Sequence, residues 1–243
     1  MYHNKMRKAI AMLELIFAMV IMGIVLMSAP SLMMQARDSG IVVAQQEAIT
    51  AGAAEIDMIL SKHWDEEDTN ESLHGPILVV DNGDSQLNEA TDTNGNPTGR
   101  RVGTPKSSNR SFVTEIGRLN ASTIGSDSGE NDASAYDDID DYDGYEDTLT
   151  NASTDVQSTE DGNYIDTSIV LNATVSYLQD SADYDSAGIT LNPLGAAGTP
   201  TTNIKGVSVT VTSGEHDEDL HTNIKFQAFS CNIGTYELKE RTF

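Results

Sequence analysis

The chain has 243 residues and carries 14 Lys and Arg side chains against 38 Asp and Glu side chains, a formal net charge of −24. This charge argues against a protein that docks on nucleic acid or on anionic lipid, because both partners require a basic face. Only one cysteine is present, Cys231, so an intramolecular disulfide and a cysteine-ligated zinc site are excluded. The length allows one or two domains.

The first element in the chain is an apolar segment behind a short basic head. Lys5, Arg7 and Lys8 form the head, and residues 10–29 (IAMLELIFAMVIMGIVLMSA) follow with a single charged side chain, Glu14. A segment of this length can cross the hydrocarbon of a bilayer as a helix. The basic head predicts a cytoplasmic N-terminus. A carboxylate inside such a segment costs roughly 2.5–3.5 kcal/mol or more, which indicates that Glu14 has a specific role.

Two simpler interpretations of this segment remain open. A cleaved secretory signal would need its site near residues 27–29, where Met27 and Pro30 are both unfavourable for cleavage. A plain membrane anchor fits the length of the segment, but it gives Glu14 no role.

The same segment resembles the N-terminus of type IV pilins and type II secretion pseudopilins. In that family a prepilin peptidase cuts after a small residue and methylates the new N-terminus, and a Glu lies five residues into the mature chain. The resemblance implies cleavage between Ala9 and Ile10, N-methylation of Ile10, and a role for Glu14 in assembly as partner of a neighbouring subunit's amino terminus. Ile10 departs from the Phe or Met that the family usually has. Pro30 falls where pilins commonly carry a helix-bending proline.

Beyond Pro30, the sequence predicts a second helical stretch over residues 31–64. Proline cannot donate to the helix ladder, so Pro30 is expected to bend or break the helix. The acidic run at residues 64–68 ends the periodicity. Apolar side chains recur at helical spacing on one face, which is expected to pack on a sheet: Val42, Ile49, Ala53, Ile56 and Leu60.

The rest of the chain predicts a β-rich head with long loops. Residues 65–165 are rich in turn-forming side chains and predict surface loops with two short apolar pieces, at 77–80 and 112–116. Three strand-like runs follow, at residues 168–178, 207–212 and 223–231. A long helix followed by an antiparallel sheet is an α+β order, and it agrees with the type IV pilin fold. The expected domains are a leader (1–9), a transmembrane or filament-core helix (10–30), an amphipathic second half of the helix (31–64) and a globular head (65–243).

The sharpest local feature of the head is an acidic run at residues 136–147 (YDDIDDYDGYED). Crowded carboxylates need a cation, solvent or raised pKa values, and closely spaced oxygen ligands suit calcium. The EF-hand spacing fails, so a calcium site rests on carboxylate density alone, and a solvated acidic loop is the simpler interpretation. The candidate calcium ligands are Asp138, Asp140, Asp141, Asp143 and Glu146.

The acidic run also resembles the aspartate-rich element of MSHA-type minor pilins, the MshD-like proteins. Residues 60–66 (LSKHWDE) resemble the stretch that closes the first helix in that family. Residues 207–212 and 226–233 resemble its late strand pair.

The remaining candidate sites are weaker. His216 and His221 lie in an acidic stretch that could bind a transition metal, but a solvated hairpin loop is favoured. Cys231 is expected to be a buried, inert thiol. No G-x-S-x-G, H-E-x-x-H or Walker pattern occurs, and an enzyme is not expected.

These resemblances imply a non-catalytic minor pilin that acts in assembly, priming or the tip of an extracellular filament. Its partners would be other pilins or pseudopilins, a prepilin peptidase and an inner-membrane assembly platform. It would wait in the inner membrane as a single-pass prepilin with its head in the periplasm, and then join a pilus or pseudopilus, with exposure at the cell surface. Two alternatives stay open: a type II secretion pseudopilin, and a membrane-anchored, calcium-dependent extracellular binding or adhesion module. The acidic run allows calcium as a cofactor, and the sequence indicates no other.

Overall fold

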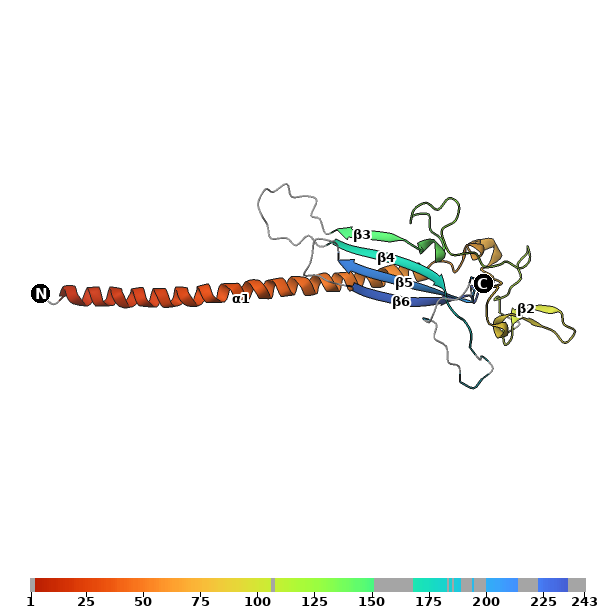
Figure 1. Cartoon of the computed structure of the whole chain (residues 1–243), viewed down its shortest axis with the longest axis horizontal. Helices are drawn as coiled ribbons and strands as arrows, with labels where there is room; N and C mark the ends of the chain where they lie inside the picture. Colours follow the sequence, from red (N-terminus) through yellow and green to blue (C-terminus); the bar gives the residue numbers. More distant parts are fainter. Residues whose placement is uncertain are drawn as a thin grey trace, which may run out of the picture. The chain divides into compact units, whose positions relative to one another are not determined.

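The computed structural model describes residues 3–105, 108–150, 168–182, 184, 186–188, 194, 200–213 and 223–235, and within the first helix it describes side chains from Met12 onward. One long helix is followed by short 3-10 helices and β-strands, which is the predicted α+β order (Figure 1). The chain divides into two compact units, Met1–Glu47 and Ala48–Phe243. The second unit holds the sheet. From here on, the head means this unit, Ala48–Phe243, which includes the last part of α1.

Helix α1 runs from His3 to Leu60 without interruption, with Pro30 inside it. The break that the sequence allowed at Pro30 is therefore absent, because a helix can lose one backbone hydrogen bond and continue. Nearby hydroxyl groups add local bonds, since Ser28 donates to the carbonyl of Val25 and Ser31 donates to the carbonyl of Ser28. The helix ends at Leu60, short of the predicted residue 64.

The face of α1 that packs in the head differs from the predicted one. Ile56 is buried as expected, and Ala53 and Leu60 are half-buried, with Leu60 against the core. Ile49, in contrast, is 47% exposed and Val42 is 51% exposed. The prediction is wrong for these two side chains. The small residues Ala48 and Gly52 are buried in this part of α1 instead.

Gly52 marks the closest approach of α1 to the sheet. A Cβ at this position would lie 2.4 Å from Cε2 of Phe226 and 2.6 Å from Cγ2 of Val211. The helix thus meets the sheet through residues without large side chains, which a search for apolar periodicity cannot mark.

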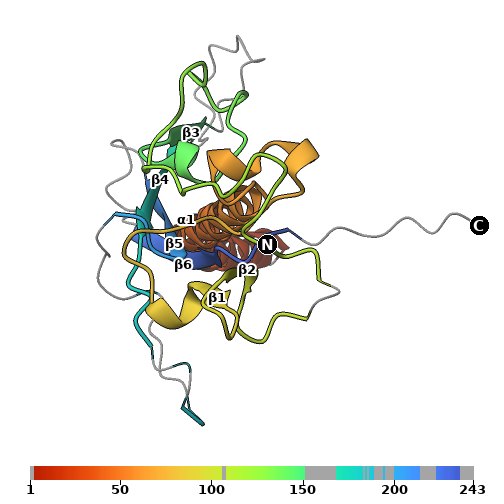
Figure 2. The ribbon, with the colours of Figure 1, turned by 90° about the vertical axis from the view of Figure 1, so that its right-hand side faces the viewer.

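Four antiparallel strands form the main sheet in the order β3-β4-β5-β6 (Figure 2). Three of them, β4, β5 and β6, confirm the predicted strands, although β5 begins a little earlier than predicted, at Ile204. The bounds are Glu146–Thr150 for β3, Ser168–Tyr177 for β4, Ile204–Ser213 for β5 and Asn223–Cys231 for β6. Strand β3 lies in a region predicted as loop, so that part of the prediction is wrong.

The core of the head follows the period of two in its central strands. In the register of β4 and β5, Leu171 pairs with Val211 and Ala173 pairs with Val209. All four side chains are buried and join Ile59 of α1 in one apolar cluster.

The segment between α1 and β3 is more ordered than the predicted surface loops. It contains a two-stranded sheet of β1 (Glu89–Thr91) and β2 (Pro97–Arg101). It also contains four short 3-10 helices: η1 (Glu66–Asp68), η2 (Glu71–Leu73), η3 (Ser85–Leu87) and η4 (Asp140–Tyr142). Both predicted apolar pieces contribute to the core, through Leu78 and Phe112.

Candidate functional site

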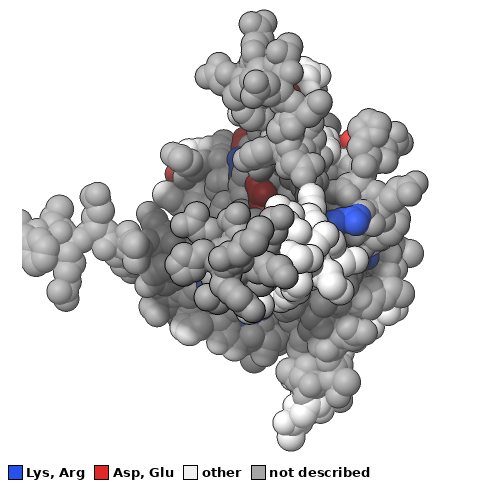
Figure 3. Space-filling view, turned by 90° about the vertical axis from the view of Figure 1, so that its left-hand side faces the viewer, with Lys and Arg blue, Asp and Glu red and all other residues white. Residues whose placement is uncertain are grey.

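The first candidate site is the apolar part of α1. Every large apolar side chain from Met12 to Met34 is more than half exposed. The helix is long and apolar enough to cross a membrane, with a mean hydropathy of 2.4 in its most apolar window. In the space-filling view from the left-hand side of Figure 1, the described surface is mostly neither acidic nor basic (Figure 3). An apolar surface of this extent is typical of contact with lipid or with other proteins.

Glu14 is exposed on this apolar surface. The structure describes Ala9 and Ile10 only as helical backbone, and their side chains lie outside the described part. Cleavage between them, methylation of Ile10 and the assembly role of Glu14 therefore stay predictions.

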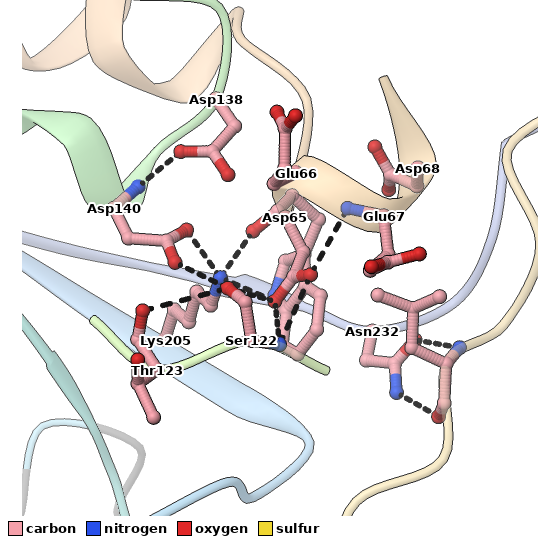
Figure 4. Close-up of polar contacts among 12 residues, drawn as sticks. Asp65, Glu66, Glu67, Asp68, Ser122, Thr123, Asp138, Asp140, Lys205 and Asn232 are labelled. Carbon is pink, nitrogen blue, oxygen red and sulfur yellow. Dashed lines mark hydrogen bonds and ion pairs between the residues drawn. The ribbon is translucent and has the colours of Figure 1, made fainter. Parts of the chain in front are cut away.

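The second candidate site is a cluster of buried charges in the head, drawn in Figure 4. Lys205 lies on β5 with an exposed fraction of 0%, and Asp65 and Asp140 are exposed to 0% and 1%. The Lys205 Nζ atom lies 2.9 Å from Oδ2 of Asp65 and forms an ion pair with Oδ1 of Asp140. It also donates to the backbone carbonyl of Trp64 at 2.7 Å. One ammonium group thus contacts two carboxylates that water does not reach.

Three distant segments of the chain place these groups. Asp65 follows the end of α1 and caps η1, where it accepts the backbone N–H of Glu67 at 3.3 Å. Asp140 begins η4, and Lys205 extends from the second residue of β5. Ser122 joins them, since its Oγ lies 3.0 Å from Oδ2 of Asp140 and 3.2 Å from Oδ2 of Asp65.

Aromatic rings form the wall of the cluster. The ring centre of Trp64 lies 4.4 Å from the Lys205 Nζ atom, and that of Tyr177 lies 5.3 Å away. The two rings meet edge to face, with their centres 6.1 Å apart. The Tyr177 hydroxyl donates to the carbonyl of Ser122 at 2.8 Å. A cation against ring faces is favourable when it is desolvated, so the rings both exclude water and stabilise the ammonium group.

Burial dominates the electrostatics of the cluster. It raises the pKa of Asp140, while the neighbouring Lys205 acts in the opposite direction. Burial and the nearby Asp140 raise the pKa of Asp138 to about 9. Burial also raises the pKa of Tyr177, and the charge of Asp65 adds to that effect. With a single cation among three buried acids, the site favours the protonated form of Asp138 at neutral pH.

The structure does not gather the five predicted calcium ligands around one point. Oδ1 of Asp138 accepts the backbone N–H groups of Asp140 and Asp141, at 2.9 and 3.2 Å. Oδ1 of Asp143 accepts the N–H of Val175 at 2.9 Å. Glu146 is exposed on β3. The calcium site stays a prediction that this geometry does not support.

The carboxyl group of Asp141 is turned inward in the same way. Its Oδ2 atom accepts the backbone N–H groups of Asp137 and Asp138, at 3.0 and 3.2 Å. Asp138, Asp140 and Asp141 are all buried. The interpretation of this run as a solvated loop is therefore wrong for these three side chains, because the backbone of the run and Lys205 satisfy their carboxylates. It holds for Asp143 and Glu146, which are exposed.

Among the described residues, the carboxylates that could share a cation are those of Glu66, Glu130 and Asp137. Burial and a hydrogen bond with Asp141 raise the pKa of Glu130 to about 7. Burial also raises the pKa of Glu66. Closely spaced acids can share protons in this way without a metal ion.

A second polar network lies at the same end of β5, around Asn203, the residue directly before the strand. Oδ2 of Asp180 accepts both the backbone N–H and the side-chain amide of Asn203, at 3.0 and 2.7 Å. The Arg101 guanidinium donates to Oδ1 of Asn203 at 2.6 Å and to the carbonyl of Asn232 at 2.7 Å. These bonds attach β2 and the chain after β6 to the start of β5, and they serve the fold.

The remaining candidates form no reactive site in the described residues. His63 bonds to Asp68 at 3.0 Å. Cys231 is half-buried and not fully buried as predicted, and burial raises the pKa of its thiol. His216 and His221 lie outside the described residues.

Lys205 and Asp65 form the centre of this cluster, and neither is among the residues predicted from the sequence. The available signal was a lone charged side chain in a strand of mostly Val, Thr and Ser residues, together with an acidic run without a nearby cation. A buried strand position rarely accepts a charge unless that charge is paired.

No family model, no curated protein and no solved structure matches this chain.

Proposed function

We propose that this chain is a subunit of a type IV filament, most like the MSHA-type minor pilins, and that it acts in assembly, priming or the tip of the filament. The observation that carries the proposal is Glu14 in an exposed apolar helix, behind a basic head and a small residue. The α+β order of a long helix and an antiparallel sheet is compatible with this class of protein.

Assembly would move the apolar surface of α1 from lipid to contact with other subunits. Before assembly, the segment from Ile10 to Ala29 would lie in lipid, where the carboxylate of Glu14 is unfavourable. In a filament the same surface would pack against helices of other subunits. The methylated amino terminus of a neighbouring Ile10 would then pair with Glu14, and in a low-dielectric helix bundle this pair is strongly preferred to an unpaired acid.

A type II secretion pseudopilin uses the same assembly logic and is the second candidate function. The sequence features that support a pilin support it equally. A membrane-anchored, calcium-dependent binding module is less well supported, because the carboxylates of Asp138 and Asp143 are bonded to backbone N–H groups.

The first experiment is mass spectrometry of the mature N-terminus, recovered from cells of a Gram-negative host with a prepilin peptidase. We expect a chain that begins with N-methylated Ile10. An intact Met1, or a start at Pro30, contradicts the proposal.

The second experiment tests the role of Glu14. We expect Glu14→Ala to leave membrane insertion and head folding intact and to reduce recovery of the chain in sheared filaments. The matched control is Asp38→Ala, which removes an exposed acid farther along the same helix. Equal losses for both variants would contradict a specific assembly role for Glu14.

A further inference from the structure

We propose that Lys205 and Asp140 condense to an intramolecular amide bond inside the head, with Asp65 as the group that transfers protons. This inference does not depend on the filament proposal. It concerns a covalent modification of the folded chain, made by its own side chains.

The reacting groups are already in contact. The Lys205 Nζ atom lies against Oδ1 of Asp140, and the opposite oxygen, Oδ2, lies 3.0 Å from the hydroxyl of Ser122. The same Nζ atom lies 2.9 Å from Oδ2 of Asp65. A nucleophile, an acceptor carboxyl group and a second carboxylate therefore share one site, and fixed proximity of this kind greatly accelerates a reaction.

The surroundings favour condensation because they exclude water. All three side chains are at most 1% exposed, and Trp64 and Tyr177 close the site. Desolvation disfavours charged forms, so transfer of a proton from ammonium to carboxylate is easier here than in water. That transfer produces the neutral amine and the neutral acid that amide formation requires.

The step balances without any further reactant. The Lys205 Nζ lone pair attacks Cγ of Asp140, and the Ser122 hydroxyl stabilises the negative charge that develops on Oδ2. Asp65 accepts a proton from the nitrogen and returns it to Oδ1, which leaves as water. An Nζ–Cγ bond forms, a Cγ–Oδ1 bond breaks, and one water molecule is released.

The product resolves an electrostatic problem in the core. A buried ion pair carries a desolvation penalty that its attraction often fails to offset, and a neutral amide has no such penalty. Asp65 keeps partners after the reaction, since its carboxylate accepts the backbone N–H groups of Ser122 and Glu67. The amide would also join η4 covalently to β5, a cross-link that a chain with one cysteine cannot make with a disulfide.

Trypsin provides a direct test on the denatured full-length chain. No Lys or Arg lies between Arg118 and Lys205 or between Lys205 and Lys225. A free Lys205 gives two peptides, residues 119–205 and 206–225. An acylated Lys205 resists cleavage, so we expect a single peptide, residues 119–225, lighter than its sequence by one water molecule. Fragmentation should place the bond between Asp140 and Lys205.

Two outcomes overturn the proposal. Complete cleavage at Lys205, with both peptides at their sequence masses, shows that no amide forms. A cross-link from Lys205 to the peptide that contains Asp65, residues 63–100, shows that the acceptor is wrong.

Matched variants separate the roles of the three groups. Lys205→Arg keeps the charge and the trypsin site, and we expect it to abolish the cross-link. Asp140→Asn should release ammonia in place of water and give a cross-linked peptide of the same mass as the wild type. Asp65→Asn should lower the fraction of chains that are cross-linked, and an undiminished fraction overturns the role assigned to Asp65.

Discussion

The apolar part of α1 and the centre of the head arrange their side chains in opposite ways. From Met12 to Met34 large apolar side chains are exposed, whereas in the head the charged side chains of Lys205, Asp65 and Asp140 are buried. An apolar side chain exposed to water is unfavourable, and so is an unpaired charge buried in protein. The difference lies in where the compensating partner is found.

In the head the partners belong to the same chain. Trp64, Ser122 and Tyr177 surround the buried charges and supply hydrogen bonds or ring faces. In the apolar segment the described residues supply no such partner, so lipid or another subunit is expected to do so. The head is thus stabilised by contacts within its own chain. The free energy of the apolar segment depends instead on the lipid or protein that surrounds it.

The largest expected effect on stability follows from removal of the buried cation. Lys205→Met leaves the carboxylates of Asp65 and Asp140 buried without a counter-charge, which should destabilise the head by about 3–5 kcal/mol. Denaturant unfolding of the full chain in detergent can be followed by the fluorescence of Trp64, the single tryptophan. The control is Lys225→Met, on the adjacent strand, where the side chain is exposed. Equal unfolding midpoints for the two variants would contradict the role of the cluster.

The next effect addresses the apolar segment alone. Val20→Arg places a charge in the middle of the exposed apolar surface, and it should weaken membrane insertion by roughly 2.5–3.5 kcal/mol. Carbonate extraction of membranes measures this, and the unfolding of the head should not change. Gln45→Arg adds the same charge to an exposed position on the same helix, outside the apolar run. Extraction of both variants to the same extent would show that the apolar run has no special contact with lipid.

Two glycines of α1, one in each region, allow the same comparison with smaller expected effects. A Cβ at Gly52 meets Phe226 and Val211, so Gly52→Ala should destabilise the head by about 1–3 kcal/mol. A Cβ at Gly23 meets nothing within 4 Å. Gly23→Ala should therefore leave the head unchanged and favour the helix by about 0.5–1 kcal/mol. Denaturant midpoints and helix content by circular dichroism would separate the two, and a tolerated Gly52→Ala would contradict the close approach.

The smallest expected effect is a pH dependence. Burial raises the pKa of Asp68 from 3.8 to about 6, with the contact to His63 acting in the opposite direction. The folded state therefore holds a proton that the unfolded state has lost, and its stabilising effect disappears as the pH rises through 6.

Asp68→Asn should reduce the loss of head stability between pH 5 and pH 7, an effect on the order of 1 kcal/mol. Asp57→Asn, at an exposed position of α1, is the control. Identical pH profiles for the wild type and Asp68→Asn would contradict this assignment.

The sequence predicted what depends on local patterns. The apolar run and the three strands from 168 onward each carry their signal within a short window, through apolar length or a period of two. The cluster around Lys205 carries no such signal, because Asp65, Asp140 and Lys205 lie far apart in sequence and meet through the sheet. The face of α1 was misassigned for a related reason, since Ala48 and Gly52 pack by being small.

The position of Lys205 along the chain also bears on how the head folds. Strand β5 lies late in the sequence, yet its Lys205 neutralises acids at residues 65 and 140. Contacts between such distant residues close large loops and slow folding. During synthesis, α1 and the acidic run emerge well before their counter-charge. The early part of the head must therefore remain incomplete until β5 appears, and the expected slow step in folding is the docking of Lys205 against Asp65 and Asp140, which closes long loops.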